Sequence, residues 1–162
     1  MRNEADISRA LQMYADAVRR ICFIRLNNRS DVEDVFKEVF LKYALHETLF
    51  ETDSHEKAWL IRVAINACKD VLKSFWRRNS FSLEEADLTG LAISDGHKDA
   101  LDVVLRLVPL ELREIIFLHY YEGYTYVEIA SILQQNENTI YTWLNRARKQ
   151  LKTMLNGESD EK

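Results

Sequence analysis

Amides, hydroxyls and cations gather on one face of a helix predicted over residues 136–155. With about 100° between successive residues, this segment divides into an apolar arc and an opposite polar face. Amides and hydroxyls can hydrogen-bond to base edges and cations can neutralise phosphates, so the polar face has the chemistry to bind nucleic acid. A basic helix taken alone is more often a solvated surface. The face consists of Asn138, Tyr141, Thr142, Asn145, Arg146, Arg148, Lys149 and Lys152.

The segment before this helix favours the nucleic-acid interpretation. Thr125 and Glu128 have capping-box spacing and start a short helix that ends near Leu133, after which Asn136 caps the basic helix. Two short helices joined by a tight turn are typical of a helix-turn-helix, which presents its second helix to the major groove.

A second group of polar residues lies on a long helix that Ser54 is expected to cap and that reaches about Trp76. Its apolar arc runs from Leu60 to Phe75, and Trp59 flanks the opposite stripe. An indole beside cations can stack on an unstacked base while the cations hold the backbone. Packing of Trp59 against a neighbouring helix is an alternative that the periodicity leaves open. The stripe consists of Arg62, Asn66, Lys69, Lys73 and Arg77.

A third surface is predicted on a helix from Asp31 to Leu45, where Ser30 and Glu33 match a capping box. An exposed Leu among carboxylates suggests a docking patch for a basic protein, although a single surface Leu usually has no such role. The outward residues are Asp34, Lys37, Glu38 and Leu41, opposite a buried side of Val32, Val35, Phe36, Val39, Phe40 and Tyr43.

The elements that position these surfaces are helices. The 162-residue chain has one Pro and four Gly, and its hydrophobic residues make up 47% of the sequence. Scarce turn formers and a helical period predict an all-α fold. Further helices are expected over residues 4–26, 99–107 and 109–121.

Composition divides the chain into two small helical domains joined by a flexible linker. Acidic and small residues and two of the four glycines collect over residues 79–98. We expect a first domain over residues 1–78, a second over 99–156 and a disordered tail over 157–162. The net charge is -4, yet the two segments that carry the DNA-binding faces are basic, so an anionic partner is not excluded.

Several other classes of protein are disfavoured. No apolar run reaches the roughly 18–20 residues of a membrane span and the N-terminus is charged, so we expect a cytoplasmic protein without membrane insertion. Cys22 and Cys68 lack metal-ligand spacing and are assigned to the core. Because the histidines show no paired ligand spacing and no catalytic or phosphate-binding motif occurs, we expect no enzyme, cofactor or metal site.

Three stretches together resemble the extracytoplasmic-function group of bacterial sigma factors, the promoter-specificity subunits of RNA polymerase. They are SDVEDVFKEVFLKYAL, AWLIRVAINACKDVL and LRLVPLELREIIFLHYYEGYTYVEIASILQQNENTIYTWLNRARKQL, and the resemblance spans about residues 8–155. It implies conserved regions two and four as tethered helical domains without catalytic residues. The implied partners are promoter DNA and core RNA polymerase, through its beta-prime clamp helices and beta flap. An anti-sigma factor is a common partner in the family, and no residue here identifies one.

The resemblance also implies roles for individual positions. The family's polymerase-docking helix corresponds to Asp34, Lys37, Glu38 and Leu41. The loop and helix that capture the melting minus 10 strand correspond to Phe50, Thr52, Asp53, Ser54, Trp59, Arg62, Asn66 and Lys73. The helix that recognises the minus 35 element corresponds to Asn138, Thr139, Tyr141, Thr142, Asn145, Arg146 and Lys149.

The chain departs from the family pattern in two places. Where many members have Gly-Thr-Val-Lys-Ser-Arg, this sequence has Asn138-Thr139-Ile140-Tyr141-Thr142-Trp143, which removes two cations from the start of the recognition helix. Fewer phosphate contacts predict weaker minus 35 affinity and a salt slope shallower by roughly 0.9 per lost contact. Glu51 and Glu56 are expected to place negative charge beside the capture loop.

Two alternative functions fit parts of the sequence. A stand-alone helix-turn-helix regulator would bind a promoter without polymerase and would use residues 1–78 as a dimerisation or effector domain. An inhibitor or adaptor would bind polymerase without melting DNA. Template-dependent transcription distinguishes both from a sigma factor.

Overall fold

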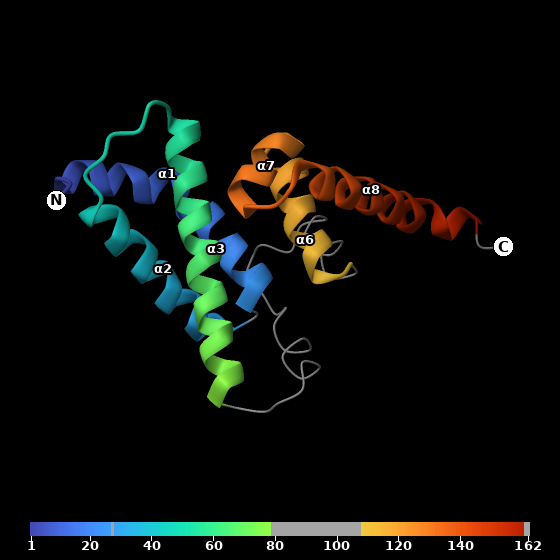
Figure 1. Cartoon of the computed structure of the whole chain (residues 1–162), viewed down its shortest axis with the longest axis horizontal. Helices are drawn as coiled ribbons and strands as arrows, with labels where there is room; N and C mark the ends of the chain where they lie inside the picture. The colour runs from blue at the N-terminus through green and yellow to red at the C-terminus, as the bar shows by residue number, and fades with distance from the viewer. Residues whose placement is uncertain (27, 79–107, 161–162) are drawn as a thin grey trace. The chain divides into compact units, whose positions relative to one another are not determined.

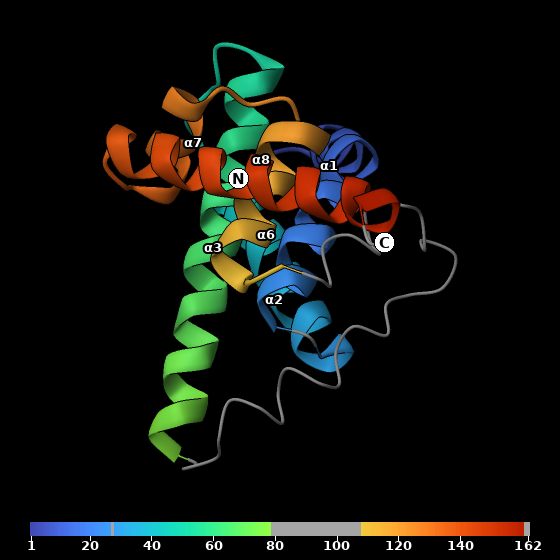
Figure 2. The same ribbon diagram turned by 90° about the vertical axis from the view of Figure 1, so that its right-hand side faces the viewer.

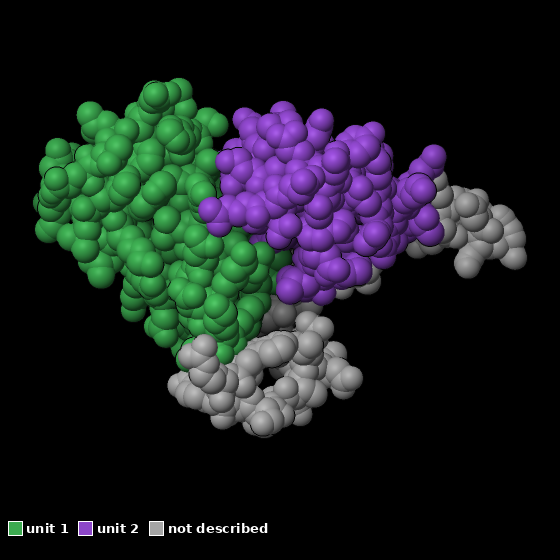
Figure 3. Space-filling view, in the orientation of Figure 1, with its two compact units in different colours: residues 1–93 green, residues 94–162 purple. Residues whose placement is uncertain are grey.

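The computed structural model describes residues 1–26, 28–78 and 108–160. The chain divides into two compact units, Met1–Ile93 and Ser94–Lys162 (Figure 3). The predicted linker over residues 79–98 and the predicted helix over residues 99–107 lie outside the described residues. Every regular element in the described part is helical, which confirms the all-α prediction.

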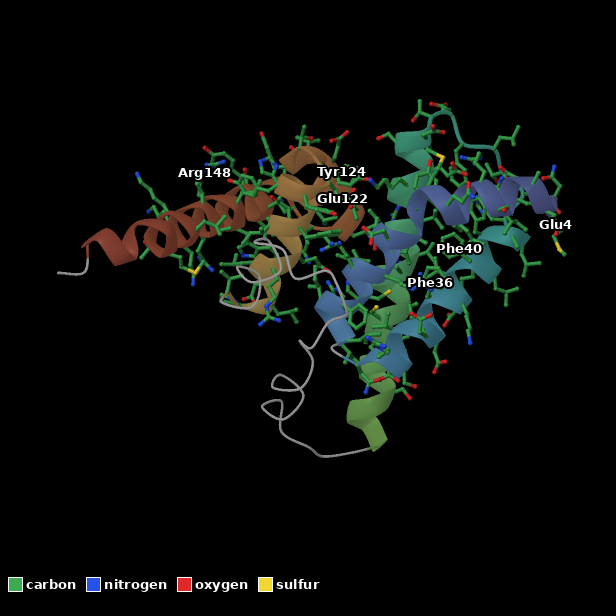
Figure 4. The ribbon with its side chains drawn as sticks, turned by 180° about the vertical axis from the view of Figure 1, so that it is seen from behind. Glu4, Phe36, Phe40, Glu122, Tyr124 and Arg148 are labelled. Carbon is green, nitrogen blue, oxygen red and sulfur yellow. The ribbon has the colours of Figure 1, made fainter. Side chains whose placement is uncertain are left out.

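The described part of the first unit consists of three helices, and each contacts the other two (Figure 1). α1 spans Glu4–Leu26, α2 spans Arg29–Leu45 and α3 spans Asp53–Arg78. The six residues assigned to the buried side of α2 are all buried, and the rings of Phe36 and Phe40 lie 4.9 Å apart (Figure 4). Cys22 and Cys68 are both buried, as predicted. The apolar periodicity therefore identified the core of this unit.

α2 starts earlier than its sequence predicts because a different residue caps it. The Asn28 side chain accepts a hydrogen bond from the Asp31 N–H at 2.9 Å, so the helix begins before Asp31. Glu33, expected in a capping box, accepts from Arg19 of α1 at 2.9 Å. The carboxylate of Glu33 thus joins two helices and does not close a local cap.

α3 shows a similar correction at its first turn. Thr52 Oγ1 accepts from the His55 N–H at 3.0 Å, which makes Thr52, and not Ser54, the capping residue. The side chain of a capping residue takes a donor that the helix leaves unpaired, and Thr52 does so two residues before the expected cap.

The second unit contains a helical segment followed by a helix-turn-helix (Figure 2). α6 spans Leu110–Ile116 and continues into the π-helical turn η1, Phe117–Tyr121, while α7 spans Tyr126–Leu133 and α8 spans Glu137–Asp160. Pro109 precedes α6, as predicted, where its missing N–H leaves no donor unpaired. Gly123 follows η1 with φ of +83°, a left-handed conformation that glycine adopts without strain.

The helix-turn-helix forms as the sequence predicts. Thr125 Oγ1 accepts from the Glu128 N–H at 3.2 Å, and the Glu128 carboxylate accepts from the Thr125 N–H at 2.9 Å. Gln134, with φ of 56°, ends α7, and the Asn136 side chain accepts from the Asn138 N–H at 2.7 Å. α7 contacts α8, so the two helices of the motif pack against each other across the turn.

α8 is longer than predicted. The periodicity ends it near Leu155 and leaves a tail over residues 157–162, whereas the helix continues to Asp160. Gly157 lies inside it, and a single glycine costs only about 1 kcal/mol in a helix interior, so it does not by itself end one.

Candidate nucleic-acid and partner interfaces

The predicted polar face of α8 is confirmed by the pattern of exposure along the helix. The opposite, apolar side of the helix faces the core, since Ile140, Leu144 and Ala147 are buried. Thr139 and Asn145 lie at the edges of the polar face and are half-buried. The exposed members of the predicted minus 35 set are Asn138, Tyr141, Thr142, Arg146 and Lys149. The structure thus brings these side chains to one surface.

The cations of this face are available to an external anion. Arg146, Lys149 and Lys152 are exposed and form no ion pair with any residue in the described ranges. Arg148 Nη1 donates to Asn145 Oδ1 at 3.0 Å, which links two polar side chains one turn apart (Figure 4). Cations that the protein does not neutralise can contribute fully to phosphate binding.

An exposed aromatic pair connects the start of α7 with α8. The rings of Tyr126, at the start of α7, and Tyr141, on α8, meet edge to face with centroids 5.5 Å apart. Tyr126 is 39% exposed, Tyr141 54% and the adjacent Val127 45%. From the sequence alone, Tyr126 is only part of the predicted start of α7. Its ring contact with Tyr141 shows that it adds an apolar edge to the polar face of α8.

Trp59 lies in a cluster of rings at the junction of α2, the following loop and α3. Its ring centroid is 4.6 Å from that of His46, 5.6 Å from Phe50 and 6.3 Å from Tyr43. Phe50 in turn stacks on Tyr43 with an interplanar angle of 5°. Both Trp59 and Phe50 are half-buried, so each packs inside the protein and also retains exposed surface. For Trp59, packing against neighbouring residues and stacking on a base were predicted as alternatives. Its partial exposure is compatible with both.

The loop residues assigned to base capture are exposed but tied to the helices. Thr52, Asp53 and Ser54 are exposed. The Thr52 hydroxyl caps α3, and the Asp53 carbonyl accepts from the Tyr14 hydroxyl at 3.2 Å. These contacts fix the backbone at the end of the loop while its side chains face outward.

Glu56 is not part of this outer surface, which corrects the expectation that it adds charge beside the loop. Its residue exposure is 4%, and its carboxylate accepts from Arg9 of α1 at 2.9 Å, from the Tyr14 hydroxyl at 3.1 Å and from the Tyr43 hydroxyl. One buried carboxylate thus joins all three helices. Sequence spacing missed this because the partners lie 13 to 47 residues away.

The ionisation of these groups reflects the network. Burial, reinforced by the hydrogen bond to Glu56, raises the pKa of Tyr14 to about 12 and raises that of Tyr43 further. The hydrogen bond to Glu56 also raises the pKa of Arg9, despite the opposing effect of burial. The folded state therefore favours protonated tyrosines and a charged arginine around the carboxylate.

The predicted stripe on α3 is present. Asn66, Lys69 and Lys73 are exposed and Arg62 is half-buried, and none of the three cations forms an ion pair within the described part of the chain. Asp70 is also exposed among them. The side chain of Arg77 lies outside the described residues.

The predicted docking patch on α2 is exposed and larger than expected. Asp34, Lys37, Glu38 and Leu41 all face solvent, with Leu41 60% exposed. Leu45, one turn further, is 59% exposed. In the sequence, the four-residue spacing between Leu41 and Leu45 indicates that both lie on one face of the helix. Leu45 is predicted only as the end of the helix, so the predicted patch does not include it. The patch is therefore an apolar edge beside charged groups.

Two further features are absent from the described ranges. No helix there combines the length and apolarity that a bilayer crossing requires. No group of three or more His, Cys, Asp or Glu side chains in the same ranges is placed to hold a metal ion.

Comparison with known proteins places both units in one family. Residues 10–80 match the family model for sigma-70 region 2, and residues 98–151 match that for sigma-70 region 4. The ECF RNA polymerase sigma factor SigW of Bacillus subtilis is 25% identical over 90% of this chain and 86% of its own length. The ECF RNA polymerase sigma factor BldN of Streptomyces coelicolor is 28% identical over 94% of this chain and 61% of its own.

A solved structure has the same fold. The sigma factor RpoE of Bartonella quintana, crystallised with the anti-sigma factor NepR, aligns with a TM-score of 0.72 and 22% identity, over 93% of this chain and 96% of that one.

Proposed function

The chain belongs to the sigma-70 family, in its extracytoplasmic-function group, and from this membership we infer that it is an RNA polymerase sigma factor for promoter-specific transcription initiation. The observation that carries this function is the occurrence of region 2 and region 4, in that order, on two separate helical units. The order matters because a helix-turn-helix alone occurs in many regulators that never bind polymerase.

We propose that α2 docks on core polymerase. Asp34 and Glu38 present carboxylates beside the exposed Leu41 and Leu45, so the patch suits a partner surface with cations around an apolar centre. By resemblance, this partner is the pair of clamp helices of the beta-prime subunit. The ion pair between Lys42 and Glu38 at 3.2 Å orients one of the carboxylates along α2.

We propose that the loop before α3 and the exposed side of α3 hold the melted minus 10 strand. Phe50 and Trp59 offer half-buried rings for an unstacked base, and stacking of about 1 to 3 kcal/mol per base can offset the cost of unstacking. Arg62 and Lys73 lie along the same helix without ion pairs in the described ranges, so they are suited to hold the strand's phosphates.

We propose that α8 recognises the minus 35 element in the major groove. Asn138 and Thr142 supply hydrogen-bonding groups, while Arg146 and Lys149 supply cations. Tyr141 adds an exposed ring that can contact thymine methyl groups, with Tyr126 against it.

We further propose that the protein acts without a catalytic site of its own, in the cytoplasm where polymerase and chromosome lie. Its residues select the start site, and the polymerase makes the RNA. An anti-sigma protein is a proposed partner, since RpoE of Bartonella quintana was crystallised with one.

Run-off transcription with purified core polymerase tests the function. Genomic templates are transcribed with and without the protein, and RNA ends are mapped. Discrete new start sites that share two spaced sequence elements support the proposal. Duplex binding without polymerase and without new transcripts would instead identify a stand-alone regulator, and polymerase binding without transcripts would identify an inhibitor.

A further inference from the structure

The Arg2 side chain joins the start of α1 to the loop that follows α2. Its Nε donates to the Tyr43 carbonyl at 3.0 Å and its Nη2 donates to the Thr48 carbonyl at 2.8 Å. Its Nη1 pairs with Asp6 at 2.9 Å, and the side chain is only 7% exposed. The guanidinium carbon lies 4.3 Å from the Tyr43 ring centroid and 5.3 Å from that of Phe50. One planar group therefore holds both the backbone and the rings of this region.

These contacts determine where Phe50 lies. Because one rigid fork binds carbonyls at residues 43 and 48, it constrains the path of the chain as it leaves α2. The guanidinium also covers Tyr43, on whose ring Phe50 stacks, and Phe50 contacts Trp59.

A continuous set of alternating charges connects Arg2 to the other end of the loop. Arg2 pairs with Asp6, Asp6 with Arg9 at 3.1 Å, and Arg9 with Glu56 at 2.9 Å. Burial alone would raise the pKa of Asp6, yet hydrogen bonds from the two arginines lower it. Arg2 thus secures the start of the loop, and Glu56, in the first turn of α3, secures its end.

We propose that Arg2 is a positioning residue for base capture: it holds residues 46–52 in the conformation in which Phe50 and Trp59 accept an unstacked base. The inference rests on the proposed function of this loop. Arg2 acts through the loop and does not contact the base. Without it, the loop must be ordered when the base binds, and that ordering reduces the affinity gained from capture.

Arg19 provides a matched control. It also joins α1 to α2 through an ion pair, to Glu33 at 2.9 Å, and through a ring contact, 3.9 Å from the Phe36 centroid. None of its contacts involves residues 46–52.

The test uses holoenzyme assembled with the wild type, Arg2→Ala, Arg2→Lys or Arg19→Ala. Each binds single-stranded oligonucleotides that carry the minus 10 sequence of a promoter found by run-off transcription, with each nucleotide in turn made abasic. Wild-type holoenzyme should bind about tenfold more weakly when the nucleotide at the captured position is made abasic. Holoenzyme with Arg2→Ala should lose less than about twofold in affinity for the same abasic oligonucleotide, and holoenzyme with Arg19→Ala should lose as much as the wild type. Arg2→Lys, which folds more securely, should resemble Arg2→Ala because an ammonium group cannot bind both carbonyls in one plane.

Three results would overturn the proposal. The first is an unchanged ratio, in both Arg2 variants, of the affinity for the intact oligonucleotide to that for the oligonucleotide abasic at the captured position. This result excludes positioning, because destabilisation alone lowers the amount of active holoenzyme and does not change this ratio. An equal drop of the ratio in Arg19→Ala shows that any weakening of the contact between α1 and α2 abolishes capture. If the wild type has no sensitive position, the loop does not capture a base, and the proposed function of the loop fails first.

Discussion

Replacement of Glu56 should destabilise the first unit more than any comparable surface charge. Glu56→Ala leaves the Tyr43 hydroxyl without its carboxylate acceptor in a buried site, at about 1–2 kcal/mol, and leaves the Tyr14 hydroxyl with only the Asp53 carbonyl, at about 0.5 kcal/mol. Loss of the Arg9 pair adds about 0.5–1 kcal/mol, reduced because that guanidinium is 40% exposed. The expected loss is about 3 kcal/mol. Glu56→Gln keeps one acceptor oxygen and should lose about 1 kcal/mol.

Urea unfolding followed by tryptophan fluorescence measures this loss. In a Trp143→Phe background the two remaining tryptophans both belong to the first unit, so the signal reports one domain and not the mixture of two. Glu33→Ala is the control, since its pair with Arg19 has the same 2.9 Å distance but side chains 39% and 41% exposed. It should cost less than about 1 kcal/mol.

Equal losses in the free energy of unfolding for Glu56→Ala and Glu33→Ala would contradict this prediction. That result would mean that burial adds nothing to the Glu56 contacts. A smaller loss in the free energy of unfolding for Glu56→Ala than for Glu56→Gln would also contradict the prediction. The alanine variant removes every hydrogen bond that the glutamine amide can still make.

Further predictions concern the separate surfaces. Asp34→Lys combined with Glu38→Lys should lower affinity for core polymerase at least about tenfold without changing the melting temperature, and unchanged affinity in a titration would reject the docking assignment. Trp59→Ala should reduce permanganate reactivity of the minus 10 strand more than closed-complex formation, whereas equal losses would restrict that ring to the core. Arg146→Ala should make the salt dependence of minus 35 binding shallower by about 0.9, and an unaltered slope removes it from the phosphate contacts. The pKa of Tyr14 is raised to about 12. Because the neutral phenol is favoured when folded, its stabilisation persists below pH 10 and is lost as the pH rises past 12, which phenolate absorbance with a Tyr14→Phe comparison will show.

Helix positions were predictable because apolar residues at helical spacing report burial directly. All six assigned core residues of α2 are buried, and the capping box of α7 forms between residues only three apart. Helix starts were less predictable where several acceptors compete. Asn28 and Thr52 cap helices in place of Ser30 and Ser54, and the choice depends on which backbone geometry the neighbouring helices permit.

The exposed surfaces were also predictable, but the groups that hold them in place were not. A helical wheel locates Glu38 or Arg146 on an outer face because the face depends only on local spacing. Glu56 depends on residues 13 to 47 positions away, and Arg2 on carbonyls 41 and 46 positions away. No spacing rule relates such groups, so their roles emerge only when the three helices are packed.

The composition of α8, the proposed recognition helix, predicts weak DNA binding by this helix alone. Its first two turns present amides, hydroxyls and an aromatic ring, and its exposed cations begin at Arg146. Base-edge contacts give discrimination, whereas phosphate contacts supply most of the binding free energy, so this helix is suited to choose a sequence more than to retain it. When α2 is docked on polymerase, binding of the second unit becomes intramolecular and its effective concentration rises, so weak contacts suffice. From the positions of these cations we therefore expect the protein to select promoters without binding DNA tightly on its own.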